Sequence, residues 1–70
     1  MKPYTAKSGK TQFKPSIEEL RECDENGEGF CLACGGTQGA EPDATKYVCE
    51  SCGEAKVYGA AELALMNLYY

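Results

Sequence analysis

Five cysteines are the residues of this sequence best suited to chemistry, and four of them stand in two copies of one unit. The two copies are Cys31-Leu32-Ala33-Cys34-Gly35 and Cys49-Glu50-Ser51-Cys52-Gly53. Fourteen residues lie between Cys34 and Cys49, close to the roughly 15–20 typical of four-cysteine zinc sites. Two residues between two thiolates allow a tight turn that brings both sulfurs to one metal ion. The spacing therefore predicts one tetrahedral centre with Cys31, Cys34, Cys49 and Cys52 as ligands.

The ligand set also indicates which metal binds and what the metal does. Structural zinc sites are closed by four protein ligands, whereas catalytic zinc keeps one position open for water. We therefore expect a single structural Zn²⁺ and no enzymatic activity, and the lack of histidine excludes imidazole catalysis. Iron in the same four-cysteine cage, as in rubredoxin, is an alternative because the ligands are identical. A thioredoxin-like redox pair and a disulfide are further alternatives.

Each turn makes specific demands on its backbone. Amides inside the turn are expected to point at the first sulfur and spread its charge. The glycine after the second cysteine, Gly35 or Gly53, can take a positive φ without a Cβ clash. Four thiolates and one Zn²⁺ together carry a formal −2, and Lys46 and Lys56 are the candidates to offset this charge locally.

Cys23 is the fifth cysteine and belongs to neither unit. It falls on the apolar side of a predicted helix, so we expect a small buried hydrophobic side chain. A fifth or alternative metal ligand and an accessible reactive thiol remain open. An odd number of cysteines also disfavours a closed disulfide framework.

Helix and strand signals surround the two cysteine units. The stretch Ser16-Ile17-Glu18-Glu19 matches a capping box, and a short helix should run from there to Asn26-Gly27. Strands are predicted at 29–32, 45–49 and 55–58, a turn-rich loop at 35–44 and a second helix at 60–68.

The chain is too small to rely on burial alone. It has 70 residues, of which only ten are Ile, Leu, Val or Phe, and a domain of this size usually needs a metal, disulfides or a partner. We expect a small metal-stapled α+β fold: a zinc ribbon with rubredoxin-like knuckles and short antiparallel strands, flanked by a short N-terminal helix and a C-terminal helix. The expected parts are a flexible basic arm (1–15), a short helix and turn (16–28), the zinc ribbon (29–58) and a C-terminal helix packing on the ribbon (59–70).

Charge is distributed unevenly along the chain. Residues 1–16 carry +4 from Lys2, Lys7, Lys10 and Lys14, whereas residues 17–70 carry −8. The four lysines are therefore the candidate nucleic-acid contacts, and the acidic remainder argues against a broad phosphate-binding face. We expect no membrane or small-molecule partner.

The expected location is the cytoplasm. No stretch approaches the ~18 apolar residues of a membrane span, and residues 1–16 have no apolar segment of a secretory signal. A reducing compartment disfavours disulfides and favours the metal site.

Several segments together resemble a known family. The resemblance lies in Gly29–Gly35, Glu41-Pro42-Asp43-Ala44, Tyr47, the unit Cys49–Gly53 and Val57-Tyr58-Gly59-Ala60. These segments are similar to small, mostly uncharacterised zinc-ribbon proteins of tailed phages and prophages. The resemblance implies a zinc-ribbon fold with ligands at Cys31, Cys34, Cys49 and Cys52, a location in the host cytoplasm if the chain is phage-encoded, and no reaction. Thr45 stands where the family often has an arginine, and Ala61-Glu62 where it has two acids.

Two segments of this resemblance also have a local interpretation. Pro42 suits the second position of a turn, so Glu41–Ala44 is expected to be a turn, with a partner contact as the alternative. Tyr47 and Tyr58 are expected to pair across the ribbon.

The sequence suggests two hypotheses for the function of this chain. The first is a protein-interaction module that presents an acidic face to an unknown protein partner. The alternative is a nucleic-acid-binding zinc ribbon, in which the lysines contact phosphates and Tyr4 or Phe13 stacks on bases.

Overall fold

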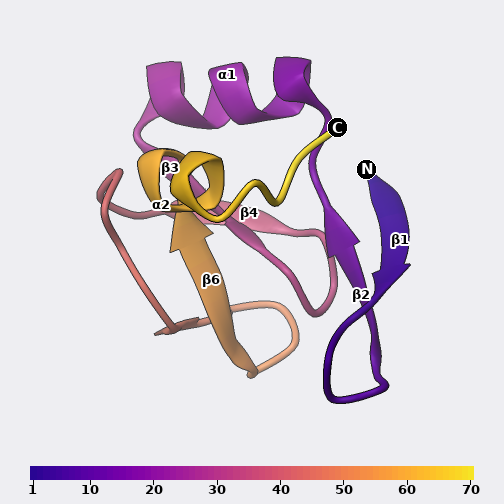
Figure 1. The fold of residues 1–70 in the computed structure, drawn as a ribbon. Coiled ribbons are helices and arrows are strands. Elements are labelled where there is room, and N and C mark those ends of the chain that lie inside the picture. The colour runs from indigo at the N-terminus through magenta and orange to yellow at the C-terminus, as the bar shows by residue number, and fades with distance from the viewer.

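The computed structural model describes residues 1–70 as six short strands and two helices (Figure 1). In chain order these are β1 (Lys2–Thr5), β2 (Thr11–Lys14), α1 (Ile17–Asn26), β3 (Glu28–Cys31), β4 (Thr37–Gly39), β5 (Tyr47–Val48), β6 (Ala55–Gly59) and α2 (Ala60–Leu65). Neither helix has the length or the apolar composition that crossing a membrane requires.

Four strands form one antiparallel sheet in the order β4-β3-β6-β5. Phe30 on β3 pairs with Tyr58 on β6, and Cys31 pairs with Val57. One cysteine unit begins at the end of β3 and the other precedes β6, so antiparallel pairing brings both to the same end of the sheet. The helices α1 and α2 lie at the opposite end (Figure 1).

The strands at 29–32 and 55–58 match the prediction closely, but the flanking strands differ from it. Strand β4 lies within the segment predicted as a loop, and β5 is only two residues long. Strand β4 forms by pairing with β3. The Gln38 side-chain amide also donates to the Val48 carbonyl (3.0 Å) and accepts from the Glu50 N–H (2.8 Å). One polar side chain thus ties β4 to the segment that contains β5.

The predicted pairing of Tyr47 with Tyr58 is wrong. Tyr47 pairs with Val57, whereas Tyr58 pairs with Phe30 on the other neighbouring strand. The register places the two tyrosines against different strands. Tyr47 instead donates its hydroxyl to the Glu41 carboxylate.

Residues 1–15 were expected to be an arm without regular structure, and the structure differs here. Strands β1 and β2 form an antiparallel hairpin in which Lys2 pairs with Lys14. The hairpin is attached to the body because the Phe13 N–H donates to the Leu32 carbonyl at 2.8 Å. Gln12 is buried and accepts a hydrogen bond from the Tyr4 hydroxyl at 2.8 Å. These contacts depend on the tertiary structure, so the spacing of apolar residues along the sequence does not predict them.

Helix α1 begins and ends where the sequence predicts. Ser16 is its N-cap and forms a reciprocal capping box with Glu19. Gly27 ends the helix in the left-handed conformation (φ 65°), and its N–H donates to the Cys23 carbonyl. The helix buries Leu20 and Cys23 against the sheet.

Helix α2 ends three residues before the predicted end at Leu68. Asn67 takes a positive φ of 57°, which stops the helix. Its N–H donates to the Ala64 carbonyl (3.2 Å), and the Leu68 N–H donates to the Leu63 carbonyl (3.0 Å). This is a Schellman motif, and Leu68 packs against the core as such motifs favour.

The Glu41–Ala44 segment is a turn, as its sequence predicts, and it packs against the start of α2. The Ala44 N–H donates to the Glu41 carbonyl at 3.0 Å. The Gly59 N–H donates to the Ala44 carbonyl (3.0 Å), and the Glu62 N–H to the Pro42 carbonyl (3.1 Å). A Cβ on Gly59 would lie 2.1 Å from the Glu41 oxygen. Only glycine fits at this close approach.

Two groups of buried side chains make up the core. The larger lies between the sheet and the helices and contains Leu20, Cys23, Phe30, Leu32, Ala60 and Leu63. The smaller contains Cys31, Cys49 and Val57 at the other end of the sheet. Two of the three members of the smaller group are candidate metal ligands.

Candidate metal centre

The structure brings the four predicted ligands together. The Sγ atoms of Cys31, Cys34, Cys49 and Cys52 all lie within 4.8 Å of one another. Two distances cross between the units: Cys31 Sγ to Cys52 Sγ and Cys34 Sγ to Cys49 Sγ, each 3.7 Å. A tetrahedral zinc with Zn–S bonds of about 2.3 Å has sulfurs about 3.8 Å apart. The cluster therefore fits one tetrahedral metal ion.

The two units, hereafter the first knuckle (Cys31–Gly35) and the second knuckle (Cys49–Gly53), have the same backbone geometry. The Gly35 N–H donates to the Cys31 carbonyl at 2.8 Å, and the Gly53 N–H to the Cys49 carbonyl at 2.9 Å. Both glycines have a positive φ, 81° and 79°. The predicted role of these two glycines is confirmed.

Backbone amides also point at the sulfurs. The N–H groups of Ser51 and Cys52 each donate to Cys49 Sγ at 3.4 Å. These bonds, from Cys52 and from Ser51, lower the pKa of Cys49 to about 6 because they stabilise the thiolate. Burial acts in the opposite direction on Cys31 and raises its pKa to about 12. In the absence of a metal ion, Cys49 is therefore more readily deprotonated than Cys31.

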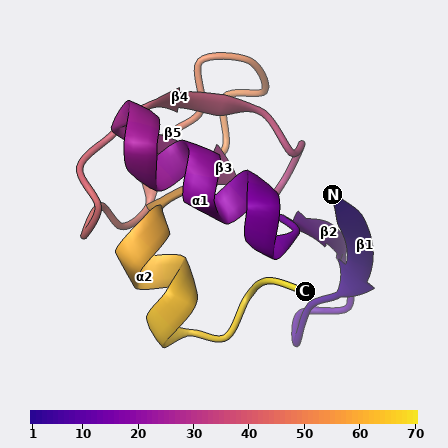
Figure 2. The ribbon, with the colours of Figure 1, turned by 90° about the horizontal axis from the view of Figure 1, so that it is seen from above.

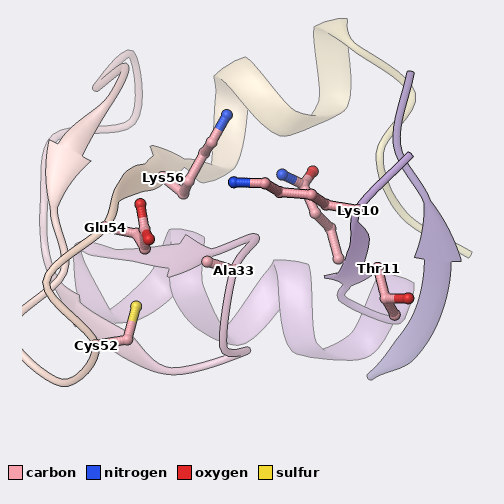
Figure 3. Close-up of a pocket in the computed structure, with 7 residues that line it drawn as sticks. Lys10, Thr11, Ala33, Cys52, Glu54 and Lys56 are labelled. Atoms are coloured by element: carbon pink, nitrogen blue, oxygen red, sulfur yellow. The ribbon is translucent and has the colours of Figure 1, made fainter. Parts of the chain in front are cut away.

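In each knuckle the first cysteine is more buried than the second. The first cysteines, Cys31 and Cys49, are buried, whereas Cys34 is half-buried and Cys52 is exposed. Cys52 lines a cleft of about 300 Å³ between the second knuckle and the β1–β2 hairpin. Figure 3 shows Lys10 reaching from the hairpin toward Lys56, with Cys52 and Glu54 on the far side of this cleft from the hairpin.

The lysines of this cleft only partly match the prediction. Lys56, one of the two lysines expected near the thiolates, lines the same cleft as Cys52. Lys46 does not line the cleft; it is exposed and precedes β5 with a φ of 54°. Lys10 also lines this cleft, which the sequence did not predict. It reaches the cleft only because the hairpin folds back on the first knuckle, and no sequence spacing signals that.

The four candidate nucleic-acid contacts all lie on the hairpin. Lys2 and Lys14 face each other across its strands, while Lys7 and Lys10 lie in the connecting turn. The ammonium groups of Lys2 and Lys14 sit 5.7 Å from the ring centres of Tyr70 and Tyr4, respectively. Phe13 is half-buried and packs against the larger core group.

Cys23 lies outside the cluster of four sulfurs. Its side chain is 2% exposed and packs in the larger core group with Leu20 and Phe30. Burial raises the pKa of its thiol, and nearby acids, Glu28 first among them, raise it further. Cys23 is a small buried hydrophobic side chain, as predicted.

The fold and the site together define a small α+β protein with antiparallel strands and four clustered cysteines that can hold one metal ion. Comparison with protein-family models, with curated proteins and with solved structures gives no significant match.

Proposed function

We propose that this chain is a non-catalytic protein in which one structural Zn²⁺, bound by Cys31, Cys34, Cys49 and Cys52, holds a zinc ribbon in shape for contact with a protein partner. The supporting observation is the sulfur cluster, with its two cross-knuckle distances of 3.7 Å. Four thiolates complete a tetrahedron and leave no position for substrate or water. Zinc bound in this way contributes folding energy rather than reactivity.

We further propose that the chain belongs to the phage and prophage zinc-ribbon family that it resembles. The two most distinctive segments of the resemblance, Glu41–Ala44 and Val57–Ala60, contact each other through the Gly59 N–H and the Ala44 carbonyl. A direct contact gives a physical reason for the two segments to occur together. Location in the cytoplasm is part of the same proposal, since four reduced cysteines need a reducing compartment.

The metal part of the proposal is tested by the mass and elemental composition of the folded protein. Native mass spectrometry should find one metal ion per chain, and elemental analysis should identify it as zinc. Iron as the native metal would contradict the proposed structural zinc and favour the rubredoxin-like alternative, since both metals accept four thiolates.

Nucleic-acid binding is the second candidate, and the hairpin favours it. Strands β1 and β2 and their turn collect four lysines and no acid on one ordered element. The test is the salt dependence of single-stranded DNA binding for the wild type and for Lys7→Gln/Lys10→Gln, which alters only the turn. If the hairpin binds phosphates, the double variant should lose up to about 1.4 from the slope of log K against log salt, about 0.7 for each lost contact. Wild-type protein that binds no DNA at low salt would exclude this candidate.

A further inference from the structure

The two helices leave an apolar groove between them at the end of the molecule opposite the metal centre. Figure 2 shows α1 and α2 side by side, with the C-terminal tail running back from α2 toward the start of α1. The groove has a volume of about 300 Å³; Ile17, Arg21 and Asp24 line its α1 wall, and Ala61 and Ala64 its α2 wall. This volume is at the lower limit for small-molecule pockets, about 300 Å³. The groove is thus suited to a few side chains of a larger partner.

Exposed apolar side chains extend the groove along α2. Leu65 follows Ala61 by one helical turn and is 79% exposed, and Ile17 on α1 is 47% exposed. The residues Ala61, Ala64 and Leu65 share one face of α2 because they are three and four positions apart. The small alanines let another backbone approach α2 closely, while Ile17 and Leu65 stand at the two edges.

Acidic side chains outnumber basic ones beside this groove, although Arg21 itself lies in its wall. Helix α1 carries five acidic residues and one arginine, a formal charge of −4. Glu19 is bound to the Met1 amine and to the Ser16 N–H. The other four acids, Glu18, Glu22, Asp24 and Glu25, form no salt bridge within the chain. Glu18 and Glu25 lie just beyond Arg21 around the helix, next to the groove wall.

We propose that this groove binds a basic amphipathic helix of a partner protein, with the apolar side chains of that helix on Ile17, Ala61 and Leu65 and its Lys or Arg side chains against the acids of α1. This inference rests on the proposed protein-interaction function and names the class of partner. A helix in this position would add a third member to the α1–α2 layer and would cover Leu65. A second copy of the chain that docked through its own α1 would place two acidic helices against each other, so this mode of self-association is disfavoured.

The probe for this proposal is a short fluorescent peptide of Leu and Lys, with the leucines at helical spacing. Anisotropy should show binding to the zinc-loaded full chain and none for the same peptide with each Lys replaced by Glu. Backbone NMR shifts in the complex should change in α1 and α2 and not in the β1–β2 hairpin.

Two substitutions locate the binding surface. Leu65→Ser removes one apolar anchor and should weaken binding about tenfold, whereas Val48→Ser, at another exposed apolar residue (63%), should leave affinity unchanged. Glu25→Lys should weaken binding several-fold at low salt, whereas Glu50→Lys makes the same charge change on the second knuckle and should not. Retained zinc and a dispersed NMR spectrum show that each variant is folded.

Several results would overturn the proposal. These are failure of the Lys peptide to bind, equal affinity for Leu65→Ser and the wild type, shifts confined to the hairpin, or a self-association that Leu65→Ser abolishes. If one of these results is found while the chain still holds one zinc and remains folded, the zinc-held structure of the proposed function stands. Loss of the zinc-dependent fold would instead contradict the proposed function itself.

Discussion

At the scale of single residues, Cys34 and Cys23 have the same side chain but lie in different surroundings. Cys34 Sγ lies 3.7 Å from Cys49 Sγ and accepts a hydrogen bond from the Gly36 N–H at 3.4 Å. Cys23 packs among apolar side chains and is not part of the cluster of four sulfurs. Removal of each should therefore have a different effect.

Cys34→Ser should abolish tight zinc binding and, with it, the dispersed NMR spectrum of residues 29–58, since metal-binding energy is folding energy in such sites. Cys23→Ala should keep one zinc per chain and should lower the free energy of unfolding by only about 1 kcal/mol. Native mass spectrometry and NMR of the two variants make the comparison. Zinc bound with full stoichiometry by Cys34→Ser would contradict the assignment of this ligand.

Gly59 is the second residue on which the fold depends locally. Gly59→Ala would place a Cβ 2.1 Å from the Glu41 oxygen and 2.3 Å from the Pro42 oxygen, both backbone atoms. We expect a loss of about 3 kcal/mol in the free energy of unfolding, measured by urea titration of the zinc form. Gly39→Ala is the matched control, because a Cβ there meets nothing within 4 Å and should change stability by less than about 0.5 kcal/mol. Similar midpoints for both variants would argue against the close approach at Gly59.

The cluster of four cysteines could be predicted from the sequence, but its surroundings only in part. The two Cys-x-x-Cys-Gly units are local patterns, and their spacing encodes the sulfur positions and the positive φ of Gly35 and Gly53. Lys10 lines the cleft together with Cys52, although it lies 21 residues before Cys31 in the chain, because the β1–β2 hairpin folds back on the first knuckle. Contacts of that kind depend on tertiary structure and leave no local signal.

At the scale of elements, the accuracy of prediction follows the origin of each element's stability. Helix α1 is defined by its own capping box and by Gly27, so its bounds could be predicted. The hairpin is joined to the body by the bond from Phe13 to Leu32. Strand β4 pairs with β3, and the two bonds of Gln38 tie it to the segment around β5. These partners are distant in sequence, so composition alone predicted an arm and a loop.

The turn at Glu41–Ala44 is tied to β5 by the bond from the Tyr47 hydroxyl to the Glu41 carboxylate. This bond raises the pKa of Tyr47 above its ordinary value. The folded protein thus holds the phenol proton more tightly than the unfolded chain does. The resulting stabilisation is complete below the unfolded pKa, about 10, and is lost as pH rises through the folded pKa.

Glu41→Ala should therefore lower the pKa of Tyr47 toward its ordinary value, which the chemical shift of its ring Cζ carbon reports during an alkaline titration. Glu50→Ala, at an acid that does not contact Tyr47, should leave that midpoint unchanged. A Tyr47 midpoint that does not move in Glu41→Ala would contradict the bond between Tyr47 and Glu41.

At the scale of the whole molecule, the two ends differ in the kind of side chains they bury. One end has the four sulfurs and only one apolar residue, Val57, in its buried group. The other has the larger core, the groove and the acidic helix α1. Because the end with the sulfurs buries so little apolar surface, we expect its stability to depend on metal binding.

The most direct test of the zinc-held fold is an NMR spectrum recorded before chelation, after chelation under reducing conditions, and after zinc is returned. We expect one zinc released per chain, loss of dispersed signals for residues 29–58, and their full recovery when zinc is added back. A metal-free, reduced chain that keeps these dispersed signals would contradict the claim that zinc holds the fold together.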